Sequence, residues 1–560
     1  MNQSCKKCSA DFKITDEDLA FYKQVSPTVG GTVLTIPTPT LCVACRQQRR
    51  HSFRNERQLY KRASAMSGDS LICLYSPDKD IKAYSNKEWW SDNWNPMDYG
   101  RDFDFDRPFF EQFDELNKNV PKPALINDNA TASENSEYTN DAFFNKNCYY
   151  VFCTWQSEEA YYSQWVSESD FTCDCMSVLN SRHVYDCTDC KDCSRSIYIH
   201  HSFNSHDCLF SYGLRNCSDC IFCTNLRGQQ YCIENKQVSK EEYEAFIETI
   251  DTKSYANYQQ YKEKIHSLML SAPRQHMNMI NCEDSRGGNL INCNNSFGFD
   301  FLGMDHCKYG FLGEDDKFCY DFTEMGKSEL CYETATCDNS YQALFSTYSC
   351  ENSYIFYCNN CHNSKYLFGC VGLRNKQYCI FNKQFTKEQW EQMVPKIVAY
   401  MTTTGEWGEF FPMSISPYGY NESNAQDYTP LLKQEALEKG ATWSDYKKPP
   451  PSAEKDIPAT ALPDNLDDTP DDILNWNIVC KNTGTVFRLQ KKELEFYRNL
   501  KVPIPRLCFE ERHKQRIAFK NPRQLWNRQC SKCFKDIETT YSPDRPETVY
   551  CEECYLAAVY

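Results

Sequence analysis

Cysteine is the residue type whose number and spacing point most directly to chemistry, because the chain of 560 residues contains 34 of them. Two CxxC pairs separated by a loop can surround one metal ion with four thiolates, which is a closed tetrahedral zinc site. One such loop near the start has 33 residues and one near the end has 17. A closed site leaves no position for a substrate, so we predict about two structural Zn²⁺ ions per chain. The predicted ligands are Cys5, Cys8, Cys42 and Cys45, and Cys530, Cys533, Cys551 and Cys554.

The two ends of the chain are copies of one module. Residues 5–22 recur as 480–497, and residues 41–78 recur as 507–544. The comparison indicates an ancestral module with two metal sites, of which each end has kept one. The positions of the second site in the first copy hold Ser64, Ser67, Ser85 and Glu88. The first site of the second copy holds Cys480, Thr483, Cys508 and Glu511.

The middle of the chain is also duplicated, since residues 226–237 recur as 373–384. Before each copy, cysteines recur at a spacing of 12, as in Cys208, Cys220 and Cys232. Short β-prone pieces alternate there with Asn, Asp, Ser and Gly, which favours stacked coils with ladders of like side chains. Capping boxes at Ser239 and Thr386 predict a helix after each copy. We therefore expect a duplicated β-solenoid-like region with capping helices, in which one coil corresponds to either one or two of these cysteine spacings.

The CxxCxxC runs in the first half of this region leave two interpretations open. They resemble iron–sulfur spacing, but neither run continues as a ferredoxin motif would. A small apolar thiol also suits the narrow core of a coil. The residues to be weighed as an additional metal site are Cys187, Cys190, Cys193, Cys217, Cys220 and Cys223.

The end modules are mildly basic, whereas the net charge of the whole chain is −16. Arginines on a rigid module are a common means of gripping phosphates, which predicts a contact with RNA or DNA. The alternative is that these cations pair with the acidic middle of the same chain. The residues concerned are Arg46, Arg49, Arg50, Arg54, Arg512, Lys514, Arg516 and Lys520.

Taken together, these patterns predict a fold that is mainly β with some α, in which zinc-ribbon modules flank the cysteine-rich middle. An acidic, Pro-rich segment is expected to act as a linker. The first residues lack the features of a secretory signal, and no apolar run approaches the ~20 residues of a membrane span, so we expect a cytoplasmic protein. The predicted segments are 1–125, 126–275, 276–414, 415–475 and 476–560, in which 415–475 is the linker.

The motifs Cys42–Arg50, Phe53–Tyr60 and Tyr75–Asp78 resemble an uncharacterised family of large cysteine-rich zinc-ribbon proteins of small-genome bacteria. The resemblance implies zinc binding and no established activity. The family's second cysteine site after Arg62 cannot be carried over, because serines stand there. Some relatives carry a CoA-transferase label, which no residue of this chain supports.

The leading hypothesis for function is a non-enzymatic scaffold or adaptor that binds a protein partner, with RNA, DNA or a ribonucleoprotein as a further candidate at the basic modules. The sequence contains no phosphate-binding glycine loop, no GxSxG and no HExxH, and we assign no catalytic residue. The alternative is a metal-cluster or thiol redox protein that uses the central cysteines.

Overall fold

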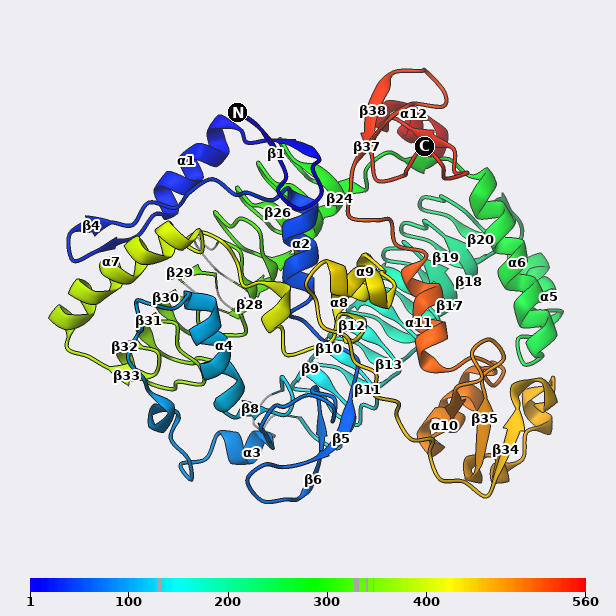
Figure 1. The fold of residues 1–560 in the computed structure, drawn as a ribbon. Helices are drawn as coiled ribbons and strands as arrows, with labels where there is room; N and C mark the ends of the chain where they lie inside the picture. The colour runs from blue at the N-terminus through cyan, green and yellow to red at the C-terminus, as the bar shows by residue number, and fades with distance from the viewer. Residues whose placement is uncertain (128–132, 327–331, 339–340, 346) are drawn as a thin grey trace. The chain divides into compact units, whose positions relative to one another are not determined.

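A computed structural model describes residues 1–127, 133–326, 332–338, 341–345 and 347–560 (Figure 1). The chain is mixed α/β, with about 30% strand and 26% helix. Helix therefore contributes more than the prediction of a mainly β protein assigned to it. Much of the additional helix lies in the end modules and in the segment predicted as a linker.

The chain divides into two compact units, each assembled from two separate stretches of sequence. Unit 1 comprises Met1–Leu125 and Met277–Tyr446, and unit 2 comprises Ile126–His276 and Lys447–Tyr560. The N-terminal module therefore folds with the second half of the middle, and the C-terminal module folds with the first half. The predicted linker 415–475 is divided between the units, and its first part forms the short helices α8 (Asn424–Tyr428) and α9 (Lys433–Glu438) of unit 1.

The first stretch of unit 2, which comes from the middle of the chain, forms a 13-stranded sheet built almost entirely from parallel pairs. We call this sheet the ladder of unit 2. The register shift between paired strands is constant, so that Phe152 lies beside Gln164 and Gln164 lies beside Met176. Only the last pair, which closes the ladder, is antiparallel. The strands are β9 (Asn140–Phe143), β10 (Phe152–Trp155), β11 (Glu158–Tyr161), β12 (Gln164–Ser167), β13 (Asp170–Cys173), β14 (Met176–Leu179), β15 (Arg182–Tyr185), β16 (Thr188–Lys191), β17 (Ser194–His200), β18 (His206–Tyr212), β19 (Ser218–Ile221), β20 (Gln230–Ile233) and β21 (Lys236–Gln237).

The backbone of this ladder turns at every third residue. Along most of residues 135–234, each third residue has a positive φ, as at Asp174, Ser177 and Asn180. Two extended residues followed by one left-handed residue form a short straight side and a corner, so four such triplets account for the register shift between paired strands. The residue after most corners is buried, and it is usually Cys, Ser, Thr, Ala or Val.

Buried thiols and hydroxyls in this ladder make the same hydrogen bonds. The Sγ atom of Cys193 lies 3.3 Å from the carbonyl oxygen of Lys191 and 3.4 Å from that of Ser202. The hydroxyl of Ser157 bonds to carbonyls at the same sequence separations. Cysteine and serine are therefore interchangeable in hydrogen bonding at these positions, which explains the CxxCxxC runs as consecutive inward-facing residues.

This equivalence predicts a difference between two substitutions at one position. We expect Cys193→Ser to lower the free energy of unfolding by less than about 1 kcal/mol, because the hydroxyl keeps the hydrogen bonds. Cys193→Val should cost about 1–3 kcal/mol, because the buried N–H of Ser205, which bonds to the Cys193 thiol, loses its partner, whereas the carbonyls of Lys191 and Ser202 keep their backbone donors. Urea denaturation of both variants checks this, and equal costs would show that the hydrogen bonds are not what the position requires.

The middle of unit 1 forms two sheets of parallel pairs, apart from one antiparallel pair at the end. The register shift is less regular here, since Arg286 lies beside Phe297 in one sheet and Ser353 lies beside Lys365 in the other. The strands are β23 (Met279–Ile280), β24 (Arg286–Ile291), β25 (Phe297–Leu302), β26 (Lys308–Glu314), β27 (Thr323–Gly326), β28 (Ala335–Asp338), β29 (Tyr341–Leu344), β30 (Ser353–Phe356), β31 (Lys365–Phe368), β32 (Gln377–Ile380) and β33 (Lys383–Gln384).

Helices follow both ladders, as predicted, and begin at the predicted caps. In unit 2 the helix is interrupted, giving α5 (Lys240–Glu248) and α6 (Tyr255–Ser271), whereas α7 (Lys387–Thr404) of unit 1 continues through Pro395. Ser239 and Thr386 both form complete capping boxes. α6 lies along the ladder of unit 2 (Figure 1), where Lys262 pairs with Asp186. Among the described residues, no helix has the length and apolar composition to cross a membrane.

The end modules consist of short hairpins and helices. In unit 1 they are β1 (Asn2–Ser4), β2 (Asp11–Lys13), α1 (Asp16–Val25), β3 (Thr28–Val29), β4 (Thr32–Val33), α2 (Val43–His51), β5 (Tyr60–Ala63), β6 (Ser70–Cys73), β7 (Ala83–Tyr84), α3 (Asn86–Trp89), α4 (Phe109–Asn119) and β8 (Lys122–Pro123), followed much later by α8 (Asn424–Tyr428) and α9 (Lys433–Glu438). In unit 2 they are β22 (Arg274–Gln275), β34 (Lys455–Pro458), β35 (Trp476–Val479), β36 (Val486–Phe487), α10 (Lys491–Leu500), α11 (Phe509–Ile517), β37 (Trp526–Gln529), β38 (Asp536–Thr539), β39 (Val549–Tyr550) and α12 (Glu552–Val559).

Candidate metal centres and the arginine clamps

The four cysteines predicted near the start of the chain gather into one cluster. The Sγ atoms of Cys5, Cys8, Cys42 and Cys45 all lie within 4.8 Å of one another. Cys42 caps the N-terminus of α2, and Cys45 lies in its first turn. The Cys45 thiol is hydrogen-bonded to Cys42 and lowers the pKa of Cys42 to about 5. A thiol that ionises this readily is suited to bind a metal ion as thiolate.

The cysteines near the end of the chain form the equivalent cluster. The Sγ atoms of Cys530, Cys533, Cys551 and Cys554 lie within the same limit of 4.8 Å. Cys551 caps α12 as Cys42 caps α2. In both clusters the second CxxC pair therefore lies at the start of a helix. Four thiol donors in a closed, partly buried arrangement fit a structural metal ion.

The same backbone turn occurs four times among the residues that the structure describes. In the first instance, the N–H of Cys5 donates to the carbonyl of Ala10, and the N–H of Ser9 donates to the carbonyl of Cys5. Both bonds recur at the positions that begin with Ser64, Cys480 and Cys530. The fifth residue of each turn has a positive φ, and these residues are Ser9, Gly68, Gly484 and Phe534. The four sites inferred from the sequence thus have one fold, although only two retain four cysteines.

A carboxylate joins the two parts of the second site of the N-terminal module, where no cysteines stand. The hydroxyls of Ser64 and Ser85 both donate to Oε2 of Glu88, at 2.6 and 2.8 Å. Burial alone would raise the pKa of Glu88, but hydrogen bonds from Ser64, Ser67 and Ser85 outweigh it and lower that pKa to about 2. Hydrogen bonds to one anion thus hold together the two parts of this site.

This pKa shift predicts a pH dependence for Glu88→Ala. Because the folded pKa of Glu88 is lowered, its contribution to stability is complete above about 4.5 and is lost as the pH falls towards about 2. We expect the difference in free energy of unfolding between the natural protein and the variant to shrink over that range. Urea denaturation at several pH values measures it, and a difference that stays constant would contradict the role assigned to the carboxylate.

The first site of the C-terminal module is held by weaker contacts. The N–H of Cys508 donates to Sγ of Cys480 at 3.3 Å, and the hydroxyl of Thr483 lies 3.9 Å from Sγ of Cys508. Glu511 accepts a hydrogen bond from Asn482 at the rim. The helix that begins at this site is α11, which carries most of the basic residues singled out in the C-terminal module.

The arginines of α2 lie inside unit 1 and pair with acidic residues of its ladder. Arg46 and Arg50 both contact the carboxylate of Asp321, at 2.8 and 3.1 Å. Arg49 donates to both Glu333 and Glu409. The side chain of Arg46 is 2% exposed and that of Arg50 is 0% exposed. Of the two interpretations left open by the sequence, the structure of this segment agrees with internal pairing.

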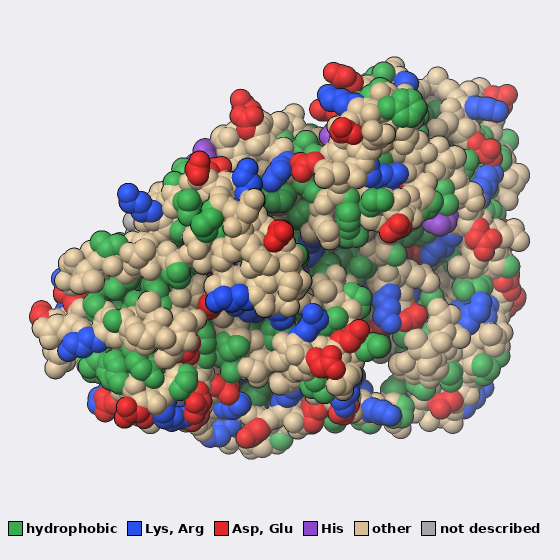
Figure 2. Space-filling view, turned by 45° about the horizontal axis from the view of Figure 1, so that its top comes forward, with side chains coloured by type: hydrophobic (Ala, Val, Ile, Leu, Met, Phe, Trp, Pro, Cys, Tyr) green, Lys and Arg blue, Asp and Glu red, His purple; other side chains and the backbone are tan. Residues whose placement is uncertain are grey.

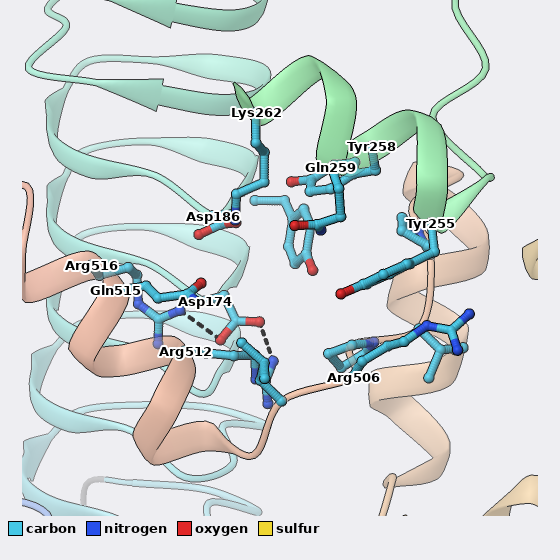
Figure 3. Close-up of a pocket in the computed structure, with 15 residues that line it drawn as sticks. Asp174, Asp186, Tyr255, Tyr258, Gln259, Lys262, Arg506, Arg512, Gln515 and Arg516 are labelled. Atoms are coloured by element: carbon cyan, nitrogen blue, oxygen red, sulfur yellow. Dashed lines mark hydrogen bonds and ion pairs between the residues drawn. The ribbon is translucent and has the colours of Figure 1, made fainter. Parts of the chain in front are cut away.

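The same arrangement occurs in unit 2. Arg512 and Arg516 of α11 both contact the carboxylate of Asp174 (Figure 3). Asp174 and Asp321 are separated by the same offset that relates the two copies in the middle of the chain. We call each set of two arginines around one aspartate a clamp. Each clamp fixes the helix of an end module to a ladder.

The remaining basic residues singled out by the sequence differ in their surroundings. Arg54 is buried and pairs with Glu56. Lys520 contacts Asp189 and donates to the hydroxyl of Ser177. Lys514 is exposed and pairs with Glu511. Burial and pairing of all but Lys514 argue against the predicted contact with RNA or DNA through these side chains.

Sequence reasoning missed the acidic partners of the arginines. Asp174 and Asp321 stand at equivalent positions of the two halves, and so do Asp186 and Glu333. Aligning the halves would have shown two acids retained at buried positions of the coil. Their partners could not have been named, because the helix and the ladder are far apart in sequence.

The central cysteines lie apart from the two metal clusters. Within the part of the chain that the structure describes, only the two terminal clusters bring three or more candidate ligand atoms within 4.8 Å of one another. The six central cysteines singled out by the sequence each have Sγ near a backbone carbonyl, as a serine hydroxyl would. They are all buried at consecutive inward-facing positions of the ladder, and they are Cys187, Cys190, Cys193, Cys217, Cys220 and Cys223.

Comparison with known proteins adds no assignment to this geometry. Neither a family model nor a curated protein matches the chain. The candidate function therefore rests on the site itself.

Proposed function

We propose that this protein is a metal-stabilised scaffold that binds a protein partner, with one Zn²⁺ in each terminal cluster. The observation that carries the proposal is that both four-cysteine clusters are closed sites within modules whose helices are clamped to the ladders. Four thiolates leave no coordination position for a substrate, so the ions serve to hold the modules together. The metal requirement is then structural.

We further propose that the parallel ladders are β-solenoids in which one coil consists of four triplets, the smaller of the two coil sizes considered above. The constant register shift in unit 2 supports this, as does the left-handed residue at every third position. A solenoid core lined by Cys, Ser and Thr is narrow, and such a fold presents a long outer face. Binding along that face is the function such an architecture serves best.

The partner surface that we propose lies on the outside of the ladder of unit 2. Phe144, Trp155 and Phe171 are 60%, 38% and 42% exposed. Trp155 stacks on Phe143, and Phe171 stacks on His183, so each ring forms a pair with the ring one register step along the ladder. Exposed aromatic rings of this kind are typical of protein–protein contacts. Acidic and basic side chains are interspersed on the face that Figure 2 shows, which does not favour a polyanion as partner.

Elemental analysis of the purified full-length protein tests the metal part of this proposal. We expect about two zinc ions per chain and no iron. A larger metal content or visible absorbance would instead support the alternative, in which the central thiols hold a cluster.

A variant pair tests the partner surface. The double variant W155A/F171A should lose a specifically captured protein, with a reduction in affinity of roughly 30-fold if the two rings are central to the contact. Phe318 is 39% exposed on the other ladder, so Phe318→Ala is the matched control and should retain the partner. Equal capture by both variants would exclude this surface.

A further inference from the structure

The two units contain the same clamp, but the charged residues beside it differ between the units. In unit 1, Glu409 supplies a carboxylate that accepts from Nη1 of Arg49 at 2.8 Å and from the hydroxyl of Thr40 at 2.5 Å. In the C-terminal module, the alignment that places Cys508 opposite Cys42 also places Arg506 opposite Thr40 and Gln515 opposite Arg49. The backbone confirms the match, because the N–H of Lys6 donates to the carbonyl of Thr40 and the N–H of Lys481 donates to that of Arg506.

Arg506 and Gln515 of unit 2 line a pocket. It is a cavity of about 50 Å³, lined by Arg506 and Gln515 of the C-terminal module and by Tyr258, Gln259 and Lys262 of α6 (Figure 3). A volume of this size has room for roughly three or four water-sized groups. In Figure 3, Gln259 and Tyr255 extend from α6 towards the space above Arg506 and Arg512.

The lining of the pocket carries an excess of positive charge. Its two acids are already paired, Asp174 with the clamp arginines and Asp186 with Lys262. Arg506 instead lies over the ring of Tyr255 and donates to two backbone carbonyls. Burial lowers the pKa of Arg506 below its ordinary value. The carboxylate of Asp464 also acts on Arg506, but Asp464 does not line the pocket. Four cations and two acids line the pocket itself, and this excess of buried positive charge favours the entry of an anion.

The pocket also contains an unused hydrogen-bond donor. Tyr258 is 3% exposed. Within the part of the chain that the structure describes, its hydroxyl has no hydrogen-bond partner. Nε of Arg506 is likewise buried without a partner among those residues. The Nε atoms of several other arginines share this state, so the Tyr258 hydroxyl is the informative group. Buried hydroxyls are nearly always satisfied in folded proteins, and this donor beside a cavity points to a bound acceptor.

We propose that this pocket of unit 2 binds a small carboxylate, at the position that the Glu409 carboxylate occupies in unit 1. Arg506 and Lys262 supply the opposite charge, and Tyr258 and Gln259 donate hydrogen bonds to the carboxylate oxygens. The size of the cavity limits the ligand to a short organic acid. Unit 1 needs no such ligand, because its own chain provides the acid.

Acetate is the probe for this site, used with the full-length protein and compared with chloride at equal ionic strength. We expect saturating acetate to raise the melting temperature of unit 2 by roughly 2–4 °C and chloride to have no comparable effect. Equal shifts with acetate and chloride would overturn the proposal.

A matched pair of variants places the effect in the pocket. Gln259→Glu supplies the carboxylate from α6, so it should raise the melting temperature without acetate and abolish the acetate shift. Gln260→Glu adds the same charge at the exposed neighbouring residue and should leave the acetate shift intact. Tyr258→Phe, which keeps the ring, should weaken acetate binding about tenfold through loss of one hydrogen bond to a charged group. Identical behaviour of Gln259→Glu and Gln260→Glu, or unaltered affinity in Tyr258→Phe, would also overturn the proposal.

Discussion

Replacing Cys42 by serine is expected to remove one metal ion from each chain and to unfold the N-terminal module. Serine is a better helix cap than cysteine, and Cys42 makes no side-chain capping bond, so the helix start itself should not suffer. The loss then comes from the cluster, whose metal-binding free energy is also folding free energy. We expect a destabilisation on the order of 5 kcal/mol or more, and a fall in zinc content from about two ions to one.

The matched control is Cys508→Ser. Cys508 caps α11 as Cys42 caps α2, but its site holds Thr483 and Glu511 in place of two cysteines. This variant should keep the full metal content. Elemental analysis and limited proteolysis distinguish the two variants. Loss of metal from Cys508→Ser, or full metal content in Cys42→Ser, would contradict the assignment of intact and lost sites.

Neutralising the acid of one clamp is expected to have the second large effect. Asp174 is 1% exposed at its side chain and is shared by two buried arginines. Asp174→Asn leaves both guanidinium groups without this anion, and removing one partner of a buried ion pair costs about 3–5 kcal/mol. We expect unit 2 to unfold at a correspondingly lower urea concentration. Asp321→Asn should have the same effect on unit 1.

The control for this prediction lies on the outer face of the same ladder. Asp170 pairs with Arg182, but the two side chains are 30% and 66% exposed. Because exposed ion pairs contribute little, Asp170→Asn should cost less than about 1 kcal/mol. If Asp174→Asn proved as mild as Asp170→Asn, the clamp would not be what fixes the helix to the ladder.

Both clamps also show how far the sequence could be followed. The sequence indicates that the arginines of α2 and α11 belong to matching basic segments. It does not decide whether they bind the phosphates of a nucleic acid or pair with acidic residues of the same chain. The structure favours the internal acid because Asp174 and Asp321 are corner residues of their ladders whose carboxylates are buried against α11 and α2. The spacing of the arginines along a helix does not reveal which distant strand the helix meets, so this choice could not be made earlier.

The ladders were predicted in part for a similar reason. Cysteines at a spacing of 12 showed a repeating coil, but the shorter period of every third residue went unnoticed because Ser, Thr, Ala and Val share the inward positions with Cys. The runs Cys187–Cys193 and Cys217–Cys223 then resembled cluster ligands. Once every third residue is seen to face inward, the spacing of these cysteines follows from that period.

The sequence by itself determined the features that depend on neighbouring residues. These are the four turns that begin at a cysteine or a serine, the helix caps at Ser239 and Thr386, and the duplication of the end modules and of the middle of the chain. A tight turn or a cap requires particular residues at fixed spacing, so it is written locally. Only the tertiary structure decided that each end module folds with the half of the middle that is farther away in sequence. It also decided that Glu409 pairs with Arg49 in unit 1, whereas the equivalent residues of unit 2, Arg506 and Gln515, line a pocket without such a carboxylate among the described residues. These outcomes depend on which buried charges meet across the fold, and no local spacing records that.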